Sequence, residues 1–241
     1  DDLRPWGVEA LVRWQHPVFG FLTPDQFIPL AEKSGNISLI TNWARTAAVR
    51  ACRLWLEEGL ALPVAVNLSS RDLQNRDLPC FVLELLRDHD LPARNLALEI
   101  TEQAVMRDFQ RATLVLECLR DLGIRIAIDD FGTGYSSLAQ IKHLPVDELK
   151  IDRSFVMDLP GNDDDAAIVR ASIDLAHNLG LEVLAEGVET QPALEWLQAQ
   201  GCEQAQGFLI SKPMPAEQFS AWVRSHERDE TQPGTVLRIA S

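Results

Sequence analysis

Short apolar stretches alternate with longer stretches of helical periodicity along most of this chain. The short stretches predict strands at residues 8–12, 63–68, 96–100, 124–129, 148–151, 182–185 and 204–210. Helical periodicity extends over residues 42–58, 77–88, 103–122, 163–179 and 191–200, and a further helix is predicted to start at Thr23-Pro24-Asp25. Strands that alternate with helices in this way indicate βα units and a parallel sheet.

Each predicted strand carries at or near its end a polar residue that is able to bind a metal or a proton. These residues are Glu9, Asn67, Glu99, Asp129, Lys150, Glu186 and Gln206. In a β/α barrel the catalytic groups come from the C-terminal ends of several strands. The pattern therefore predicts an α/β fold, a TIM-like (β/α)8 barrel, whose function lies in this ring of side chains.

A closed barrel of this type has eight strands, and seven are predicted from residue 8 onward. The first strand is therefore expected before Asp1, and the chain is expected to be truncated at its N-terminus. One barrel domain is predicted for residues 1–225, because 241 residues is a usual length for a single barrel. The polar residues 226–241 include Gln232-Pro233-Gly234, which predicts a loosely held tail.

The charge of the chain argues against some classes of ligand. The formal net charge is −14, from 36 acidic and 22 basic residues. Proteins that follow a nucleic-acid backbone need clustered Lys and Arg, so a broad DNA- or RNA-binding surface is not expected. An anionic substrate would need metal ions to bind to so acidic a protein.

The cysteines and the hydropathy indicate the setting of this domain. Its cysteines, Cys52, Cys80, Cys118 and Cys202, are far apart and include no CxxC pair, so neither a zinc site nor a disulfide framework is predicted. No apolar run approaches the roughly 18 residues of a membrane span. A domain in the reducing cytoplasm, with no membrane contact of its own, is the simplest expectation.

The residues of the ring suggest a metal-dependent reaction. Glu9, Asn67, Glu99, Asp129 and Asp130 supply only oxygen ligands, which suit Mg²⁺ or Mn²⁺. Adjacent aspartates at one strand end are able to bind two ions, and a pair of ions roughly 3.5–4 Å apart is the usual arrangement for attack on a phosphodiester. Lys150 would orient or deprotonate the attacking water, or neutralise charge on the phosphate; a basic role needs a lowered pKa.

Other interpretations of the same residues remain open. A single Glu or Asn at a strand end is often a hydrogen-bonding loop residue, and Asp129-Asp130 with the glycines after it would also form a turn and helix cap. An enolase-like barrel uses acidic metal ligands and a Lys base to abstract a proton, but it would not need a second metal ligand beside Asp129. A purely structural barrel would not explain so many polar strand ends.

Seven motifs in the same order resemble those of the EAL-domain family, over about residues 8–223. They are Glu9-Ala10-Leu11 with Val12-Arg13-Trp14, Asn67-Leu68-Ser69, Glu99-Ile100-Thr101-Glu102, Asp129-Asp130-Phe131-Gly132-Thr133-Gly134-Tyr135-Ser136-Ser137-Leu138, Leu149-Lys150-Ile151-Asp152, Ala185-Glu186-Gly187-Val188-Glu189 and Gln206-Gly207-Phe208. The resemblance implies a phosphodiesterase that hydrolyses the bacterial second messenger cyclic di-GMP to linear pGpG, with two Mg²⁺ or Mn²⁺ ions.

The resemblance also implies a role for each residue of the ring. Glu9, Asn67, Glu99 and Asp129 would hold the first ion, and Asp129 would bridge to a second ion that Asp130 binds. Lys150 would contact the attacking water, and Glu186 and Gln206 would complete the network of water and metal. Glu9, Lys150, Glu186 and Gln206 are therefore the expected catalytic residues.

Further roles implied by the resemblance lie around the ring. Leu11, Arg13, Pro24 and Asp152 are expected substrate contacts, and Arg13 would bind a phosphate. Glu102 would anchor the loop of residues 131–137, which couples metal binding to dimer contacts. A homodimer is expected through the loop near Tyr135 and the helix that follows it. An upstream sensory or GGDEF domain, or a membrane anchor, is plausible in the full-length protein.

The sequence departs from the family pattern in two places. Phe208 stands where the family commonly has Tyr, which removes a hydroxyl and keeps the ring. The missing first strand commonly supplies a Gln-Pro-Ile segment near the guanine base. A receptor that binds cyclic di-GMP without cleaving it is the main alternative; loss of metal ligands would favour it, and every ligand position is present here.

Overall fold

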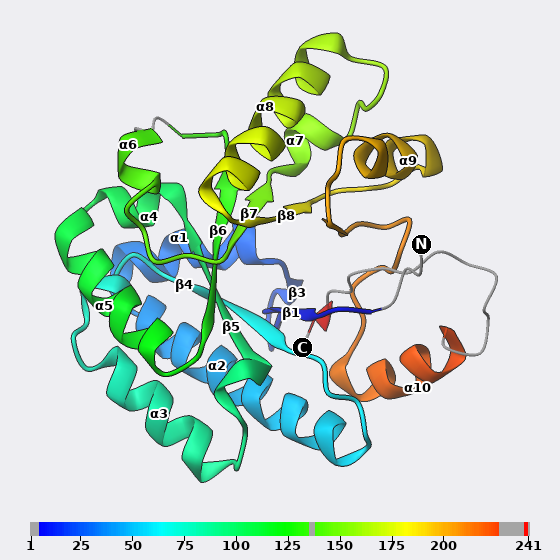
Figure 1. Cartoon of the computed structure of the whole chain (residues 1–241). Helices are drawn as coiled ribbons and strands as arrows, with labels where there is room; N and C mark the ends of the chain where they lie inside the picture. Colours follow the sequence, from blue (N-terminus) through cyan, green and yellow to red (C-terminus); the bar gives the residue numbers. More distant parts are fainter. Residues whose placement is uncertain (1–4, 135–137, 227–238, 241) are drawn as a thin grey trace.

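A single curled parallel sheet forms the centre of the molecule (Figure 1). The computed structural model describes residues 5–134, 138–226 and 239–240. The strands lie in the order β10-β1-β4-β5-β6-β7-β8-β9, and all their pairings are parallel. Their bounds are β1 (Val8–Leu11), β4 (Val64–Leu68), β5 (Leu96–Thr101), β6 (Arg125–Phe131), β7 (Glu148–Ile151), β8 (Glu182–Ala185), β9 (Gln204–Ala205) and β10 (Ile239–Ala240). The predicted α/β barrel-like class is confirmed.

Helices connect successive strands and lie around the outside of the curled sheet (Figure 1). They are α1 (Pro24–Ser34), α2 (Ile37–Glu57), α3 (Leu78–Asp88), α4 (Glu102–Met106), α5 (Phe109–Asp121), α6 (Leu138–Ile141), α7 (Arg153–Val156), α8 (Asp163–Leu179), α9 (Gln191–Ala199) and α10 (Ala216–His226). Helix α1 begins as predicted: Thr23 and Gln26 form a reciprocal capping box, and Pro24 occupies the first turn, where its missing N–H costs little.

The two faces of each strand have different chemistry, because successive side chains of a strand point to opposite sides. One face carries apolar residues that are buried in the main core, such as Val64 and Val66 in β4 and Leu96 and Leu98 in β5. The hydrophobic core therefore lies between the sheet and the helices. The other face lines the inside of the curl with small and polar side chains, and it provides the functional groups.

Several segments differ from the sequence-based expectation. Helix α2 begins at Ile37, five residues earlier than predicted, and α10 was not predicted. Residues 14–22, for which no element was predicted, form an antiparallel hairpin of β2 (Trp14–His16) and β3 (Gly20–Leu22). The helix predicted at 103–122 is divided into α4 and α5, because the Asp108 side chain accepts a hydrogen bond from the Arg111 N–H and starts a new helix. The last strand is shorter than predicted and pairs only at residues 204–205.

The edge strands of the sheet, β10 and β9, decide whether the predicted barrel closes. Strand β10 pairs with β1 through Ala10 and Leu11, and within the described residues no pairing joins β9 to β10. Asp1 to Arg4 and most of the predicted tail lie outside the described residues. A strand before Asp1 and the division at residue 225 therefore stay predictions. Across the described part of the chain, every helix is too short or too polar to span a membrane.

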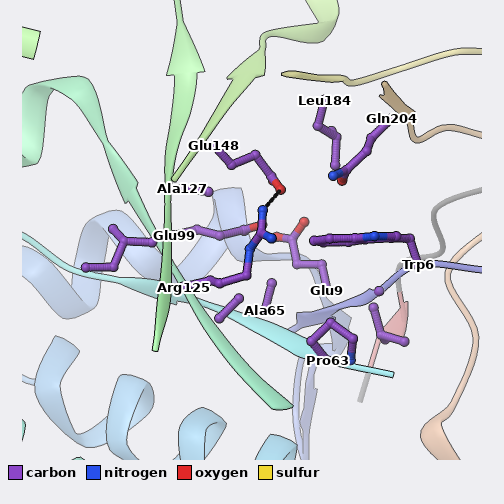
Figure 2. A pocket seen from close by; sticks show the side chains of 14 residues that line it. Trp6, Glu9, Pro63, Ala65, Glu99, Arg125, Ala127, Glu148, Leu184 and Gln204 are labelled. Carbon is purple, nitrogen blue, oxygen red and sulfur yellow. Dashed lines mark ion pairs between the residues drawn. The ribbon is translucent and has the colours of Figure 1, made fainter. Parts of the chain in front are cut away.

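A polar cluster occupies the amino ends of the strands, inside the curl (Figure 2). Arg125, Glu148, Glu182 and Gln204 are each the first residue of a strand. Arg125 Nη2 lies 2.7 Å from Glu182 Oε2 and 3.6 Å from Glu148 Oε2, and Gln204 Nε2 donates to Glu182 Oε2 at 2.9 Å. The Trp6 ring covers the Arg125 guanidinium at 4.5 Å.

Glu148 is the buried carboxyl of this cluster, with 8% of its surface exposed. Burial raises the pKa of Glu148 to about 7, and this effect outweighs the nearby positive charges of Lys150 and Arg125. The folded protein therefore holds a proton on Glu148 more tightly than the unfolded chain does. The stability that comes from the neutral carboxyl is lost as the pH rises through about 7.

We expect Glu148→Gln to gain stability relative to the parent as the pH rises. Glutamine stays neutral, so the variant avoids the cost of ionising a buried group, a difference on the order of 1–3 kcal/mol between about pH 5 and about pH 8. Thermal or denaturant unfolding in EDTA at both pH values measures it. Glu182→Gln, which removes the nearer partner of Arg125, should weaken the protein at both values. Unfolding curves of Glu148→Gln that follow the parent at every pH would contradict the assignment.

Candidate active site

The carboxyl ends of the strands bring the predicted ring of polar side chains together. Glu9 lies in β1, Asn67 in β4, Glu99 in β5, Asp129 and Asp130 in β6, and Lys150 in β7, while Glu186 and Gln206 directly follow β8 and β9. The parallel register places Asn67 opposite Glu99, and Thr101 opposite Asp129. Because neighbouring strands end at the same edge, the residues lie on one rim of the curled sheet.

Lys150 lies at the centre of this ring and is fully buried, with 0% of its side chain exposed. Its Nζ is 2.8 Å from Glu99 Oε1 and 2.9 Å from both Asp129 Oδ1 and Glu186 Oε1. Glu9 Oε2 lies farther away, at 3.8 Å. Burial alone would lower the pKa of Lys150, but the surrounding carboxylates raise it well above its usual value. Lys150 is therefore an ammonium group in this structure.

Asn67 is oriented by its neighbour Glu9. Its Nδ2 donates a hydrogen bond to Glu9 Oε1 at 2.7 Å. The amide nitrogen is thereby turned toward β1, and the carbonyl oxygen is the atom of Asn67 that remains to act as an acceptor or a metal ligand. A neutral oxygen donor thus stands between the carboxylates of β1 and β5.

An irregularity in β6 turns two adjacent aspartates toward one place. In a regular strand, neighbouring side chains point to opposite faces. Here the register of β6 against β7 shifts between Ile128 and Phe131, and Asp130 has φ +54°, in the left-handed region. Ligand oxygens of Asp129, Asp130 and Glu186 consequently lie within 4.8 Å of one another. This cluster is a candidate metal site, and it includes Glu186 in addition to the predicted pair.

The buried carboxyls of the ring carry more negative charge than the single ammonium group of Lys150 neutralises. Burial raises the pKa of Glu99 to about 7 and that of Glu186 to about 8, although Lys150 opposes both shifts. Burial and the charge of Asp129 also raise the pKa of Asp130. Additional positive charge at this rim would oppose these shifts, because it favours the ionised carboxylates.

The donor set fits divalent cations that prefer oxygen. All candidate ligands are carboxylate or amide oxygens, as Mg²⁺ and Mn²⁺ prefer. In addition, Gln206 Oε1 is buried and has no hydrogen-bond partner among the described residues. A buried acceptor of this kind is costly unless a cation or a water satisfies it. The residues present therefore fit the metal that the sequence predicts.

Gln206 is held in place by its backbone. Its N–H donates to the Ala185 carbonyl and its carbonyl accepts from the Val188 N–H, each at 2.8 Å. The chain then passes so close to Val188 that a Cβ on Gly207 would lie 2.1 Å from the Val188 carbonyl oxygen. Only glycine fits this approach at residue 207.

A family model described as the EAL domain matches residues 2–213. The chain belongs to the EAL domain family. It is 50% identical over 218 residues to a Pseudomonas aeruginosa protein named bifunctional diguanylate cyclase/cyclic di-GMP phosphodiesterase MucR, covering 90% of this chain and 32% of that protein. It is 44% identical over 234 residues to the cyclic di-GMP phosphodiesterase NbdA of the same organism, covering 97% of this chain and 30% of NbdA. The chain spans about a third of the length of these curated relatives.

Solved structures of EAL domains share the fold. The PaMucR phosphodiesterase in complex with c-di-GMP superposes with a TM-score of 0.86 at 48% identity, covering 90% of each chain. The FimX EAL domain from Pseudomonas aeruginosa bound to c-di-GMP gives a TM-score of 0.76 at 26% identity, over 83% of this chain and 80% of that one.

The predicted substrate contacts of this EAL domain lie at the end of β1, in the segment after it, at the start of α1 and directly after β7. Leu11 ends β1, and Pro24 begins α1. Arg13 Nη1 donates to the Val12 carbonyl at 2.9 Å; burial lowers the pKa of Arg13, and the charge of Asp25 opposes this. Asp152 caps α7 by accepting from the Ser154 N–H at 3.0 Å, and its charge contributes to the raised pKa of Asp130. Asp152 therefore has a structural role in addition to the predicted one.

Sequence reasoning missed a buried network behind Asn67. Arg45 and Asp72 form an ion pair at 3.0 Å, and Asp72 is hydrogen bonded to Ser69. The spacing of Ser69 and Asp72 is typical of a turn closed by side chains, and it is the one local signal for this network. Nothing in the sequence near Arg45 indicates its partner, 27 positions away.

Proposed function

We propose that this EAL domain is a phosphodiesterase that hydrolyses cyclic di-GMP to linear pGpG with the help of Mg²⁺ or Mn²⁺. The observation that best supports this proposal is the burial of Lys150 among the carboxylates of Glu99, Asp129 and Glu186. The same predicted ring includes Asn67 and Gln206. The relatives named above are cyclic di-GMP phosphodiesterases, and the solved neighbours contain c-di-GMP. The proposal extends these properties to this chain.

Two groups of ligands would hold the ions. Glu9, Asn67, Glu99 and Asp129 would bind one, and Asp130 with Asp129 would bind the other; the short distance between oxygens of Asp129, Asp130 and Glu186 adds Glu186 to the second group. When bound, such ions polarise the phosphate and lower the pKa of a water molecule. The protein supplies the fixed oxygens and the dry rim that holds them.

Lys150 would act as a hydrogen-bond donor and positive charge in this reaction. Without a metal, the carboxylates of Asp129, Glu186 and Glu99 raise the pKa of Lys150 well above its usual value, which favours orientation of the water and neutralisation of charge on the phosphate. Cations bound to the same carboxylates would oppose this shift, so the role of Lys150 as a base stays a prediction. Glu186 contacts Lys150 directly and would help to fix its position.

Arg13, Leu11 and Pro24 would contact the substrate. A guanidinium group at the rim of so acidic a protein suits a phosphate, which it binds through paired N–H donors. Leu11 and Pro24 are half-buried at the ends of β1 and α1 and would provide apolar contacts to a nucleotide. Asp152 would contact the substrate through Oδ2, because Oδ1 caps α7.

Glu102 would anchor the loop that follows Asp130. It starts α4 directly after β5 and is buried, with 5% exposure. Gly134 lies against its carboxylate, since a Cβ on Gly134 would be 2.6 Å from Glu102 Oε1. The contact supports the predicted anchoring as far as residue 134. Tyr135, Ser136 and Ser137 lie outside the described residues, and dimerisation through this loop stays a proposal.

A regulatory domain upstream is also proposed. The MucR relative is named as both a cyclase and a phosphodiesterase, and this chain covers 32% of it. A GGDEF or sensory domain in the longer protein would supply the input that controls this site, and a homodimer of EAL domains would transmit it.

The central experiment is hydrolysis of cyclic di-GMP by the purified chain with Mg²⁺, Mn²⁺, Ca²⁺ or EDTA, with products separated by chromatography. We expect pGpG that requires Mg²⁺ or Mn²⁺ and falls at least about a hundredfold in Glu9→Ala, because that variant loses a metal ligand. Glu57→Ala, an exposed change on α2, is the matched control. Tight binding of cyclic di-GMP with no product under any metal would instead indicate a receptor.

We expect Lys150→Ala to bind Mn²⁺ and to lose turnover, with kcat lower by about 10²–10³-fold, the usual effect of removing one preorganised donor. Calorimetric titration of Mn²⁺ and steady-state kinetics separate the two properties. Lys142→Ala removes an exposed lysine and serves as the control. Unchanged kcat in Lys150→Ala would refute the role assigned to this residue.

We expect Glu102→Ala to lower activity about tenfold by releasing the loop, with every predicted metal ligand still present, an effect of the size seen when groups that orient ligands are removed. Gly134→Ala should have the same direction of effect, because its methyl group would collide with the Glu102 carboxylate. Glu117→Ala, on the exposed face of α5, is the control. Parental activity and Mn²⁺ affinity in both variants would exclude the anchoring role.

A further inference from the structure

The chain after Asn67 forms a turn that is closed by side chains in both directions. The Ser69 N–H and hydroxyl both donate to Asp72 Oδ2, at 2.8 and 2.6 Å. In return, the Asp72 N–H donates to the Ser69 hydroxyl at 3.3 Å and to the Ser69 carbonyl at 3.0 Å. Reciprocal bonds of this kind fix the backbone of a turn. The end of β4 is therefore not free to fray.

The carboxylate of Asp72 is held from behind by α2. Arg45 Nη2 donates to Asp72 Oδ1 at 3.0 Å, and Thr41 Oγ1 donates to the same atom at 3.2 Å. Arg45 is 0% exposed and Asp72 is 3% exposed. Charges so far from water are retained only when they are paired and hydrogen bonded. One oxygen of Asp72 thus closes the turn while the other fastens it to the helix.

Two further arginines fasten the same turn to its surroundings. Arg107, which follows α4, donates to the Ser70 hydroxyl at 2.9 Å, and Arg71 donates to the Gly35 carbonyl at 3.2 Å. Helix α4 follows the strand that carries Glu99, and Gly35 lies between α1 and α2. The turn after β4 is therefore hydrogen bonded to the segment after α4 and to the segment between α1 and α2.

Asn67 lies near the end of β4, two residues before this turn. Its side chain has a single described polar contact, the hydrogen bond to Glu9. An amide ligand has no charge to hold it near a cation, so its oxygen is useful only if the backbone presents it in the right place. Pairing with β5 holds this backbone as far as Leu68, and the Asp72 network holds the chain directly after it.

We propose that Asp72, held by Arg45, is a positioning residue that fixes Asn67 as a metal ligand. The inference rests on the proposed metal-dependent function and adds residues to it that lie outside the ring. Asp72 touches neither substrate nor metal; it acts through the Ser69 to Asp72 turn. A network that only stabilised the fold would affect unfolding and leave metal affinity unchanged.

The test measures Mn²⁺ affinity of the full chain by calorimetric titration, without substrate, beside the melting temperature in EDTA. We expect Ser69→Ala and Asp72→Asn to weaken Mn²⁺ binding by about tenfold or more, the usual effect of groups that orient metal ligands. Asparagine has only one side-chain acceptor, so it satisfies either the Ser69 donors or Arg45. Ser69→Thr keeps the hydroxyl and should restore parental affinity.

Val169→Ala separates positioning from stability. Val169 is fully buried in α8, between β7 and β8 and away from β4. This variant should lower the melting temperature and keep parental Mn²⁺ affinity. If Asp72→Asn does not fold, the pair Ser69→Ala and Ser69→Thr decides, because loss of one hydroxyl leaves the ion pair with Arg45 intact.

Two outcomes would overturn the proposal, and they differ. Parental Mn²⁺ affinity in Ser69→Ala, with a lower melting temperature, would show that the turn is structural only and would leave the proposed function standing. Failure of the parent itself to bind Mn²⁺ would remove the metal-dependent function and this inference together.

Discussion

The structure depends on the burial of one ammonium group among several carboxylates. Lys150 has no exposed surface and lies within 2.9 Å of carboxylate oxygens from Glu99, Asp129 and Glu186. Buried charges are tolerated only when their partners are held rigidly, since the desolvation cost is offset by good geometry alone. Parallel strands meet this requirement because their ends are fixed by a continuous ladder of hydrogen bonds. The sheet therefore fixes most residues of the ring, and the loops add further restraints.

The interior of the curled sheet is polar at both ends. The main hydrophobic core lies elsewhere, so it is separate from the residues of the proposed site. Glu148 and Arg125 lie at the amino ends of the strands and the ring lies at the carboxyl ends, and small side chains such as Ala65 and Ala127 line the pocket that contains Arg125 and Glu148 (Figure 2). Apolar burial instead takes place between the sheet and its helices. Residues of the interior are therefore able to change chemically with little effect on the main core, as in other barrels whose sites lie at one end.

The sequence predicted the features that depend on local pattern. Strands β7 and β8 and helix α8 have the predicted bounds, because apolar runs, asparagine caps and a terminal glycine specify them within a few residues. The hairpin of β2 and β3 and the break at Asp108 were missed, since each rests on a few local hydrogen bonds that hydrophobic periodicity does not reveal. The left-handed Asp130 and the pairing of Arg45 with Asp72 were also missed. Both are set by contacts between segments far apart in the chain, which no local pattern encodes.

Proton and metal binding are linked at the proposed site. Burial raises the pKa of Glu99 to about 7 and that of Glu186 to about 8, so both carboxyls bind protons more tightly than exposed glutamates do. A cation that binds to carboxylates must displace such protons, and its affinity therefore rises with pH through the same range. Asn67 and Gln206 are exempt from this competition because amides do not titrate there. At the proposed site these two amides therefore offer neutral oxygens at every pH, whereas the carboxylates become poorer ligands as they take up protons.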